Sequence, residues 1–181
     1  MLSKIILAGE GGQGVQTIAQ ILADAAVAEN KEVCYIPNFG VEQRGGVSIA
    51  FVQIGDEPVS FPKFIKGDIV IALSCRAVER TEQYVGKNTV FVYDSTSNCN
   101  SPQAQAKAVK GIPALNVANS ELTPRVFNMI ILGAVLGATN VVKIESVEGV
   151  IDQKLGKKFE KDPGLRELNV KALRRGMEMV A

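Results

Sequence analysis

Short apolar runs alternate along the chain with segments in which apolar residues recur every three or four positions. The runs predict strands over residues 5–8, 32–36, 47–54, 68–74, 89–93 and 114–117. The helical spacing predicts helices over residues 15–28, 76–85, 102–110, 121–138, 146–159 and 165–180. Strands that alternate with helices of this length are typical of a mostly parallel sheet covered on both faces. We therefore expect a Rossmann-like, three-layer α/β domain with helices on both faces of the sheet.

Residues 39–63 depart from this alternation, because they contain two glycine-rich turns and no convincing crossover helix. We predict a hairpin-like excursion there. Residues 129–136 are apolar nearly all round, which predicts a helix segment buried inside the domain or at a subunit interface, with the former favoured. The length of 181 residues fits a single domain over residues 1–181.

Charge and composition narrow the function classes. The 20 Lys and Arg residues nearly balance the 19 Asp and Glu residues, which argues against a nucleic-acid partner. With 46% hydrophobic residues, the chain can bury a core. No apolar run approaches the roughly 18 residues that cross a bilayer, so we expect no membrane partner. The chain begins directly with a strand pattern rather than a signal peptide, which predicts a cytoplasmic location.

The absent residue types exclude further chemistry. There is no histidine, which excludes Ser/His/Asp triads and histidine-based metal sites. Cys34, Cys75 and Cys99 lie far apart in the sequence and are too few for an iron–sulfur cluster, which usually needs four thiolates. We expect them to be reduced and mostly buried, and we expect neither a metal site nor a catalytic residue.

A glycine-rich turn follows the first predicted strand. Its candidate ligand-binding residues are Gly9, Gly11, Gly12, Gln13 and Gly14. The turn fits the pattern G-x-G-x-x-G and opens a helix, so its backbone amides can receive a phosphate, with Gln13 as a side-chain donor. A dinucleotide site would need an acidic residue at the end of the second strand, where Asn38 stands instead, so NAD is disfavoured. The alternative without a ligand is a tight structural turn.

A second polar, glycine-rich segment spans residues 38–48. Arg44, followed by Gly45 and Gly46, offers a planar forked donor to a phosphate or carboxylate. The segment could equally be a hairpin turn with a surface arginine. Asp94, at the carboxyl end of a predicted strand, is a weaker candidate because no motif surrounds it.

Three segments together resemble a known family. They are Gly9–Gly14, Phe39–Gly46 and the stretch from Asn128 to Ala134, and the ending from Asn169 to Gly176 is also similar. In this order and spacing they resemble the gamma subunits of the 2-oxoacid:ferredoxin oxidoreductases along essentially the whole chain. The Arg44-Gly45-Gly46 loop looks more like 2-oxoglutarate-, branched-chain- or indolepyruvate-type gamma chains than like many pyruvate-type ones.

The resemblance implies a non-redox subunit of an enzyme that decarboxylates a 2-oxoacid to an acyl-coenzyme A and passes electrons to ferredoxin. Thiamine diphosphate and the iron–sulfur clusters are then expected only in partner subunits, and coenzyme A in a shared site. The implied partners are alpha, beta and in some complexes delta subunits, with ferredoxin indirectly and a homodimer when the chain is isolated. Two alternatives stay open at this point: a stand-alone nucleotide- or NAD(P)-binding protein, and a scaffold subunit without a ligand.

Overall fold

The computed structural model describes residues 2–39, 46–99 and 105–181. The strands are β1 (Leu2–Glu10), β2 (Glu32–Asn38), β3 (Val47–Gly55), β4 (Ile69–Ala72), β5 (Val90–Asp94) and β6 (Ala108–Ile112). The helices are α1 (Val15–Ala28), α2 (Cys75–Thr81), α3 (Ala114–Glu121), α4 (Phe127–Thr139), α5 (Ile144–Lys161) and α6 (Pro163–Glu178). Short 3₁₀ turns at Glu82–Tyr84, Ser95–Ser97 and Pro124–Val126 complete the described structure.

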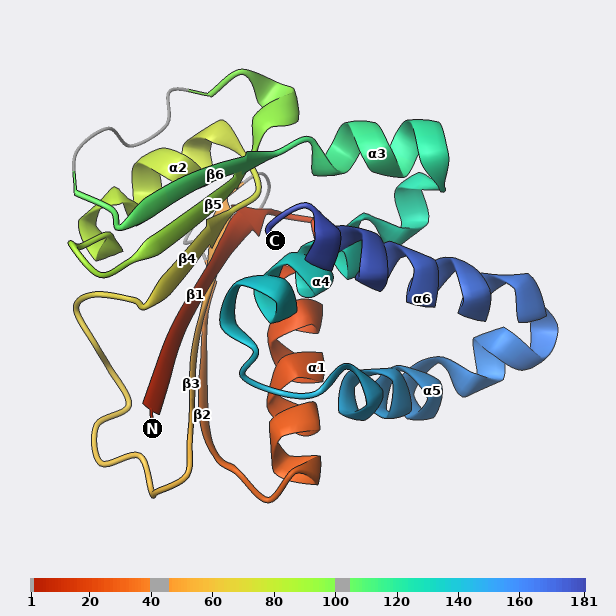
Figure 1. Cartoon of the computed structure of the whole chain (residues 1–181), viewed down its shortest axis with the longest axis horizontal. Helices are drawn as coiled ribbons and strands as arrows, with labels where there is room; N and C mark the ends of the chain where they lie inside the picture. Colours follow the sequence, from red (N-terminus) through yellow and green to blue (C-terminus); the bar gives the residue numbers. More distant parts are fainter. Residues whose placement is uncertain (1, 40–45, 100–104) are drawn as a thin grey trace.

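The six strands form one open sheet in the order β2-β3-β1-β4-β5-β6 (Figure 1). β1 pairs in parallel with β4, and the parallel ladder continues through β5 to β6. On its other side β1 pairs antiparallel with β3, which in turn pairs antiparallel with β2. The predicted mostly parallel α/β fold is confirmed, and β2 with β3 forms the hairpin part of the predicted excursion.

Alternating side chains of the strands feed two apolar clusters, one on each face of the sheet. Ile5 and Leu7 of β1 face the larger cluster, with α1, α3 and α4, whereas Ile6 and Ala8 face a smaller cluster with α2. α5 and α6 pack on α1 and α4 and form a further layer over them (Figure 1). No helix in the described part of the chain is long and apolar enough to span a membrane.

α4 is enclosed between the sheet and α6, which explains why its sequence is apolar nearly all round. Nine of its residues are buried. A Cβ on Gly133 would lie 1.9 Å from the carbonyl oxygen of Leu173, and a Cβ on Gly176 would lie 1.9 Å from that of Ile130. The two helix backbones are therefore in direct contact. Residues 129–136 are packed inside the domain, as the favoured prediction had it.

Two predicted elements are wrong. The segment 102–110 was expected to be helical, but Ala108–Ile112 forms the edge strand β6, and residues 100–104 lie outside the described part. Residues 114–117 were expected to be a strand but begin α3. Pairing with β5 outweighs the helix propensity of the Ala- and Lys-rich segment, as tertiary context often does.

Substitution of Gly133 tests the contact between α4 and α6. Gly133→Ala should lower the free energy of unfolding by at least about 2 kcal/mol, because the new methyl group meets backbone that cannot rotate away. Gly149→Ala is the matched control: Gly149 is exposed on α5 with no atom within 4 Å of a Cβ. It should gain about 0.5–1 kcal/mol from helix propensity. Urea denaturation measures both, and equal stability of the two variants would contradict the close packing.

Candidate functional site

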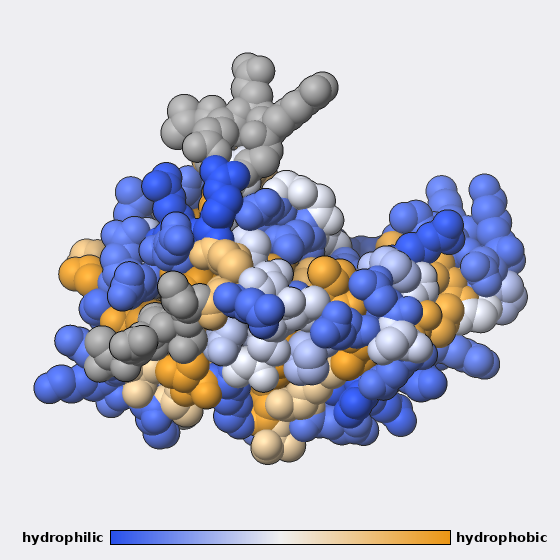
Figure 2. Space-filling model, turned by 90° about the horizontal axis from the view of Figure 1, so that it is seen from above, coloured by the Kyte–Doolittle hydropathy of each residue, from blue (hydrophilic) through white to orange (hydrophobic). Residues whose placement is uncertain are grey.

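The two glycine-rich segments meet at one edge of the sheet. Glu10, the last residue of β1, lies opposite Val47, the first residue of β3, and Gly9 lies opposite Ser48. Because β3 runs antiparallel to both neighbours, the connection from β2 to β3 sits at the edge where β1 delivers the glycine turn. The parallel strands β4 and β5 end at this edge too. The arrowhead of β1 points to it in Figure 1, and Figure 2 looks onto it.

Three of the four glycines in residues 9–14 are required by the fold itself. Gly12 and Gly14 have φ angles of 92° and 80°, in the left-handed region where only glycine is unstrained. Gly9 is buried, and a Cβ there would lie 2.8 Å from Oε1 of Gln13 and 2.9 Å from Cγ2 of Val15. A bare structural turn therefore accounts for these three glycines without any ligand.

Gly11 has no such structural reason. It is exposed, its φ lies outside the left-handed region, and no atom of the described residues would come within 4 Å of an added Cβ. The fold would accept any small side chain at this position. A glycine here is instead suited to a ligand that approaches the backbone closely.

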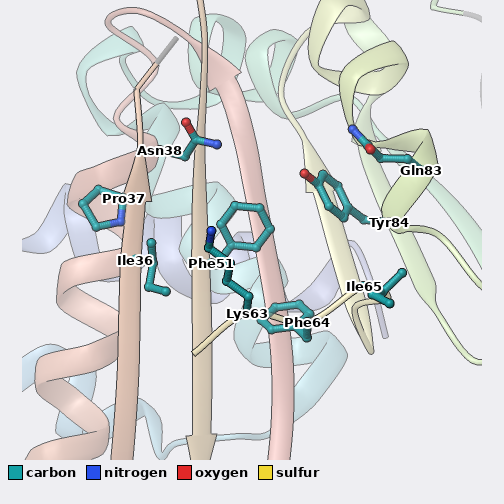
Figure 3. Close-up of a pocket in the computed structure, with 9 residues that line it drawn as sticks. All are labelled: Ile36, Pro37, Asn38, Phe51, Lys63, Phe64, Ile65, Gln83 and Tyr84. Carbon is teal, nitrogen blue, oxygen red and sulfur yellow. The ribbon is translucent and has the colours of Figure 1, made fainter. Parts of the chain in front are cut away.

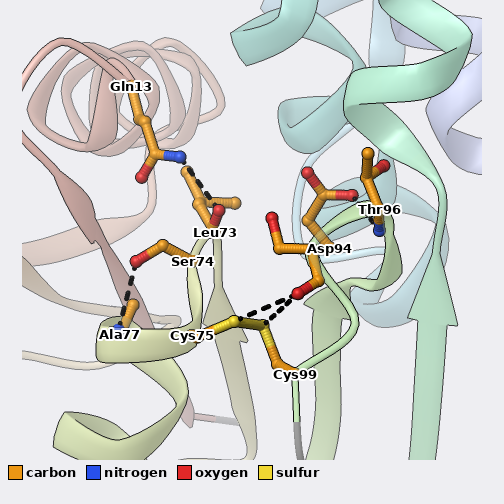
Figure 4. Close-up of a disulfide and its surroundings, with 9 residues drawn as sticks. Gln13, Leu73, Ser74, Cys75, Ala77, Asp94, Thr96 and Cys99 are labelled. Atoms are coloured by element: carbon orange, nitrogen blue, oxygen red, sulfur yellow. Dashed lines mark hydrogen bonds between the residues drawn. A yellow bond between two sulfur atoms is a disulfide. The ribbon is translucent and has the colours of Figure 1, made fainter.

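Gln13 holds the turn together from inside. Its Oε1 accepts a hydrogen bond from the backbone N–H of Glu10 (2.6 Å), and its Nε2 donates to the carbonyl of Leu73 (2.9 Å) (Figure 4). Its side chain thus links the end of β1 to the residue that follows β4. A direct contact from Gln13 to a ligand stays a prediction, with one N–H of the carboxamide left for it.

Free amides of the turn lie together with the N-terminus of α1. Among the described residues, no acceptor lies within hydrogen-bonding distance of the backbone N–H groups of Gly11, Gly12 and Gly14. Asn128, the second residue of α4, packs on Gly14, since a Cβ on Gly14 would lie 3.1 Å from Cβ of Asn128. The first turns of α1 and α4 therefore meet here. The first turn of α1 places unpaired N–H groups and partial positive charge at this point, which favours an anion. α4 contributes packing only, because it continues the 3₁₀ turn Pro124–Val126 and the N–H of Phe127 already donates to the carbonyl of Pro124.

The second glycine-rich segment is only partly within the described residues. Arg44 and Gly45 lie outside them, whereas Gly46 is half-buried directly before β3. The base of this segment is fixed to α1 through Gln16, which donates to the Ser48 hydroxyl (2.6 Å) and accepts from Tyr35 (2.5 Å). Burial raises the pKa of the Tyr35 phenol, so the hydroxyl stays protonated and keeps donating this hydrogen bond.

Other polar groups at the same edge have local partners. Asp94 is 2% exposed and caps the 3₁₀ turn Ser95–Ser97 after β5, because its side chain accepts a hydrogen bond from the N–H of Thr96. Thr96 accepts from the N–H of Asn116 in α3. Within the described ranges, no three His, Cys, Asp or Glu side chains form a group that could hold a metal ion. Sequence reasoning missed Asn128 as a neighbour of the turn, because no local signal predicts a contact between the two helix starts.

Three surface cavities, of about 670, 420 and 440 Å³, lie elsewhere on the molecule. None of the residues that line them belongs to the segment 9–14. Within the described part of the chain, the glycine turn is exposed at Gly11 and Gly12, and no described side chain would lie within 4 Å of a Cβ on either residue. As far as the described residues go, its amides thus face an open surface rather than an enclosed pocket.

The family model for pyruvate ferredoxin/flavodoxin oxidoreductases matches residues 4–179. The chain belongs to this family. The resemblance to the gamma subunits of the 2-oxoacid:ferredoxin oxidoreductases is thereby confirmed, because several relatives of this family are such subunits. The chain is 36% identical to the 2-oxoglutarate synthase subunit KorC of Methanocaldococcus jannaschii, over 99% of this chain and 94% of the relative. It is 35% identical to the pyruvate/ketoisovalerate oxidoreductases common subunit gamma of Pyrococcus abyssi, with coverages of 94% and 92%.

Solved structures of this family share the fold. The gamma subunit of a keto/oxoacid ferredoxin oxidoreductase from Geobacter sulfurreducens superposes with a TM-score of 0.82 at 27% identity, over 98% of both chains. The 2-oxoglutarate:ferredoxin oxidoreductase from Magnetococcus marinus, with 2-oxoglutarate, coenzyme A and succinyl-CoA bound, gives a TM-score of 0.89 at 25% identity.

Some relatives are much longer than this chain. The match covers 99% of this chain but only 31% of the Magnetococcus chain. The ketoisovalerate oxidoreductase subunit VorA of Methanothermobacter thermautotrophicus is 33% identical over 93% of this chain and only 35% of the relative. The chain thus spans about a third of these longer family members and nearly the whole of the separate gamma subunits.

The expectation of three reduced, mostly buried cysteines in this family member is wrong. Cys75, at the start of α2, and Cys99 form a disulfide with their Cα atoms 5.0 Å apart, and all three cysteines are only half-buried (Figure 4). Both sulfurs contact the carbonyl oxygen of Ser97, at 3.4 and 3.8 Å. A disulfide sulfur carries no proton, so these are contacts rather than hydrogen bonds while the bridge is intact. The bridge ties the segment after β5 to the segment after β4.

Alanine substitutions separate the roles of the glycines. Gly12→Ala and Gly14→Ala should each cost about 1–2 kcal/mol of unfolding free energy, because both backbones are left-handed. Gly11→Ala should not destabilise the chain. Chemical denaturation of the three isolated variants measures this. Equal losses for all three would contradict the distinction between Gly11 and its neighbours.

Reduction tests the disulfide. Cys75 and Cys99 are separated by 24 positions, and a bridge closing a loop of this size is worth about 3 kcal/mol in the chain-entropy model. Dithiothreitol, or Cys75→Ser, should therefore lower the free energy of unfolding by about that amount, and Cys34→Ser should not. Alkylation of the unreduced, denatured chain should label Cys34 alone by mass spectrometry. Labelling of all three cysteines would contradict the bridge.

Proposed function

We propose that this chain is the gamma subunit of a 2-oxoacid:ferredoxin oxidoreductase complex and forms one side of its coenzyme A site. The whole reaction is oxidative decarboxylation of a 2-oxoacid to an acyl-coenzyme A, with electrons passed to ferredoxin. Thiamine diphosphate and the iron–sulfur clusters belong to partner subunits in this proposal. The chain acts as one gamma domain over residues 1–181, and a cytoplasmic location stays a prediction from the sequence.

The observation that carries the proposal is the open, amide-lined turn whose Gly11 the fold does not require. Coenzyme A carries a pyrophosphate and a ribose phosphate, and such groups bind at glycine turns that open helices. The amides of Gly11, Gly12 and Gly14 would donate to phosphate oxygens. The first turn of α1 would stabilise the negative charge. Gln13 would keep the turn in shape.

The position of the second segment supports the same site. Gly46 and the start of β3 lie at the sheet edge that carries the turn, and Arg44 and Gly45 directly precede Gly46 in the sequence. In the proposal the Arg44 guanidinium binds a phosphate of the same coenzyme or a carboxylate of a partner subunit. The bound coenzyme A in the Magnetococcus oxidoreductase supports a coenzyme site in this family.

The 2-oxoacid itself is selected elsewhere in this proposal. One relative is named as the common gamma subunit of pyruvate and ketoisovalerate oxidoreductases, so that gamma chain serves enzymes with two different 2-oxoacids. A subunit that binds only the shared second substrate, coenzyme A, is consistent with such use. The roles of the residues in this chain are accordingly to bind and orient an anionic carrier rather than to move protons.

The dinucleotide alternative is not favoured. In a Rossmann site the acidic residue ends the strand beside β1, but here β3 separates β2 from β1, and β2 ends in Asn38. A scaffold role without a ligand would explain Gly9, Gly12 and Gly14 but not Gly11.

Gly11→Asp tests the coenzyme site within the assembled complex. The added carboxylate would stand where the phosphate approaches, so the KM for coenzyme A should rise at least tenfold, equivalent to about 1.4 kcal/mol. The KM for the 2-oxoacid should not change. Initial rates of reduction of ferredoxin by the reconstituted complex give both values.

Two variants serve as controls for Gly11→Asp. Gly11→Asn adds the same bulk without the charge and should raise the KM for coenzyme A less. Gly149→Asp places the same charge on α5 and should leave this KM unchanged. Size-exclusion chromatography checks that each complex assembles. An unchanged KM for coenzyme A in a fully assembled Gly11→Asp complex would overturn the coenzyme role of the turn.

A further inference from the structure

One half of the sheet has an uncovered face. α2 covers β1 and β4 on the side of the smaller cluster and reaches only the beginning of β3, at Ile49, and no described helix covers β2 there (Figure 1). A cavity of about 670 Å³ lies at this place, with side chains from β2, β3, the segment after β3 and the 3₁₀ turn after α2. The apolar part of its lining consists of Ile36, Pro37, Phe51, Phe64, Ile65 and Tyr84. We name it the β2–β3 groove.

The floor of the groove is aromatic and fixed. The ring of Phe51 meets Phe64 edge-to-face at 5.7 Å and Tyr84 edge-to-face at 5.3 Å between centroids (Figure 3). Such contacts are specific in geometry and hold the three rings relative to one another. The groove therefore exists before any partner arrives and needs no rearrangement to form.

The rim of the groove presents apolar side chains that the surrounding structure holds outward. Gln53, only 2% exposed, donates to the carbonyls of Phe61 (2.7 Å) and Pro62 (3.1 Å). Nζ of Lys66 donates to the carbonyls of Gln83 and Val85, both at 2.8 Å. Ile65, which lines the groove, is 80% exposed, and Phe61, which lines the adjacent cavity of about 420 Å³, is 78% exposed.

The opposite side of the molecule carries charged, ion-paired side chains and is suited to contact with solvent. On α5 and α6, Arg166 pairs with Asp152 through two hydrogen bonds of 2.7 Å, and Arg175 pairs with Glu121 of α3. In Figure 2 the right-hand end, where these helices project, is mainly hydrophilic. Large apolar side chains at the rim of a preformed groove are by contrast typical of an interface.

The longer relatives indicate what covers the groove. In VorA and in the Magnetococcus oxidoreductase, the part similar to this chain makes up only 35% and 31% of the polypeptide. The rest is covalently attached in those proteins, whereas nearly the whole of KorC is matched by this chain. Where the same two parts are separate chains, they have to find each other through a surface of sufficient affinity. That surface has to be present on this chain.

We propose that the β2–β3 groove, with Ile65 at its rim and the exposed Phe61 in the adjacent cavity, is the docking surface for the separate subunit that corresponds to the remainder of these longer relatives. The inference rests on the function proposed above. The groove runs to Asn38, at the end of β2 and at the same sheet edge as the glycine turn. A subunit seated in the groove thus reaches the open turn and supplies the wall that this chain lacks.

Charge substitution at these two exposed positions tests the docking surface. Phe61→Glu and Ile65→Glu, alone and together, should leave the isolated chain folded because both side chains are largely exposed. The double variant should bind the complex that lacks this subunit at least about tenfold more weakly than the wild type does. Interferometry with the separately purified partner complex measures the affinity, and thermal unfolding checks the fold.

Val27→Glu is the matched control. Val27 is 60% exposed at the end of α1, on the other face of the sheet, and its substitution should change the affinity less than twofold. Wild-type affinity of the double variant, or equal weakening by Val27→Glu, overturns the proposal. So does a rim substitution that only dissolves a homodimer of the isolated chain, because a second copy would then be the occupant.

The failure of this proposal is distinguishable from that of the coenzyme site. At saturating concentrations of the double variant, the KM for coenzyme A should return to the wild-type value, since the glycine turn is intact. Gly11→Asp should behave in the opposite way, with normal affinity for the partner complex and a raised KM. A Gly11→Asp chain that fails only to bind the partner would assign the turn, not the groove, to docking.

Discussion

The direction of three neighbouring strands decides what this molecule can bind. β1 pairs in parallel with β4 and antiparallel with β3, so it joins a parallel half-sheet to an antiparallel hairpin. Because of this junction, the turn after β1, the connection before β3 and the ends of β4 and β5 all lie at one edge. A Rossmann unit would place the strand that follows α1 directly beside β1, whereas here β3 lies between β1 and β2. The hairpin instead brings a second polar, glycine-rich segment to the first.

The sequence predicted an element correctly where its apolar residues follow one clear periodicity. It predicted the wrong element where a short segment fits both a helix and a strand. The spacing of Val15, Ile18 and Leu22 predicted α1 with the bounds that the structure shows. The short run from Ala114 looked like a strand, although Ala114, Val117 and Ala118 already have the helical spacing of a buried face and Pro113 precedes it. The edge strand β6 has exposed positions and weak β-formers, and only its pairing with β5 makes it a strand.

The candidate site shows the same division between local and tertiary information. The glycine turn and its place before a helix were readable from six residues, because backbone geometry is encoded locally. The inward side chain of Gln13, the contact of Asn128 with Gly14 and the Cys75–Cys99 bridge join residues 60, 114 and 24 positions apart. No motif predicts such contacts, since each depends on how helices and strands pack. The sequence also could not tell a glycine that the fold requires from a glycine that lets a ligand approach, and the structure makes this distinction at Gly11.

A site divided between two chains has a thermodynamic consequence. The turn offers amides on an open surface, and the β2–β3 groove, which ends at the same sheet edge, offers apolar side chains. If the docked subunit completes the coenzyme pocket, the free energy that couples the two events must be reciprocal, so the coenzyme tightens the complex by the factor by which the complex tightens the coenzyme. A lone chain then binds the coenzyme weakly even with every donor in place. Fusing the two parts into one chain, as in the longer relatives, supplies the partner at a high local concentration and so maintains the complete pocket.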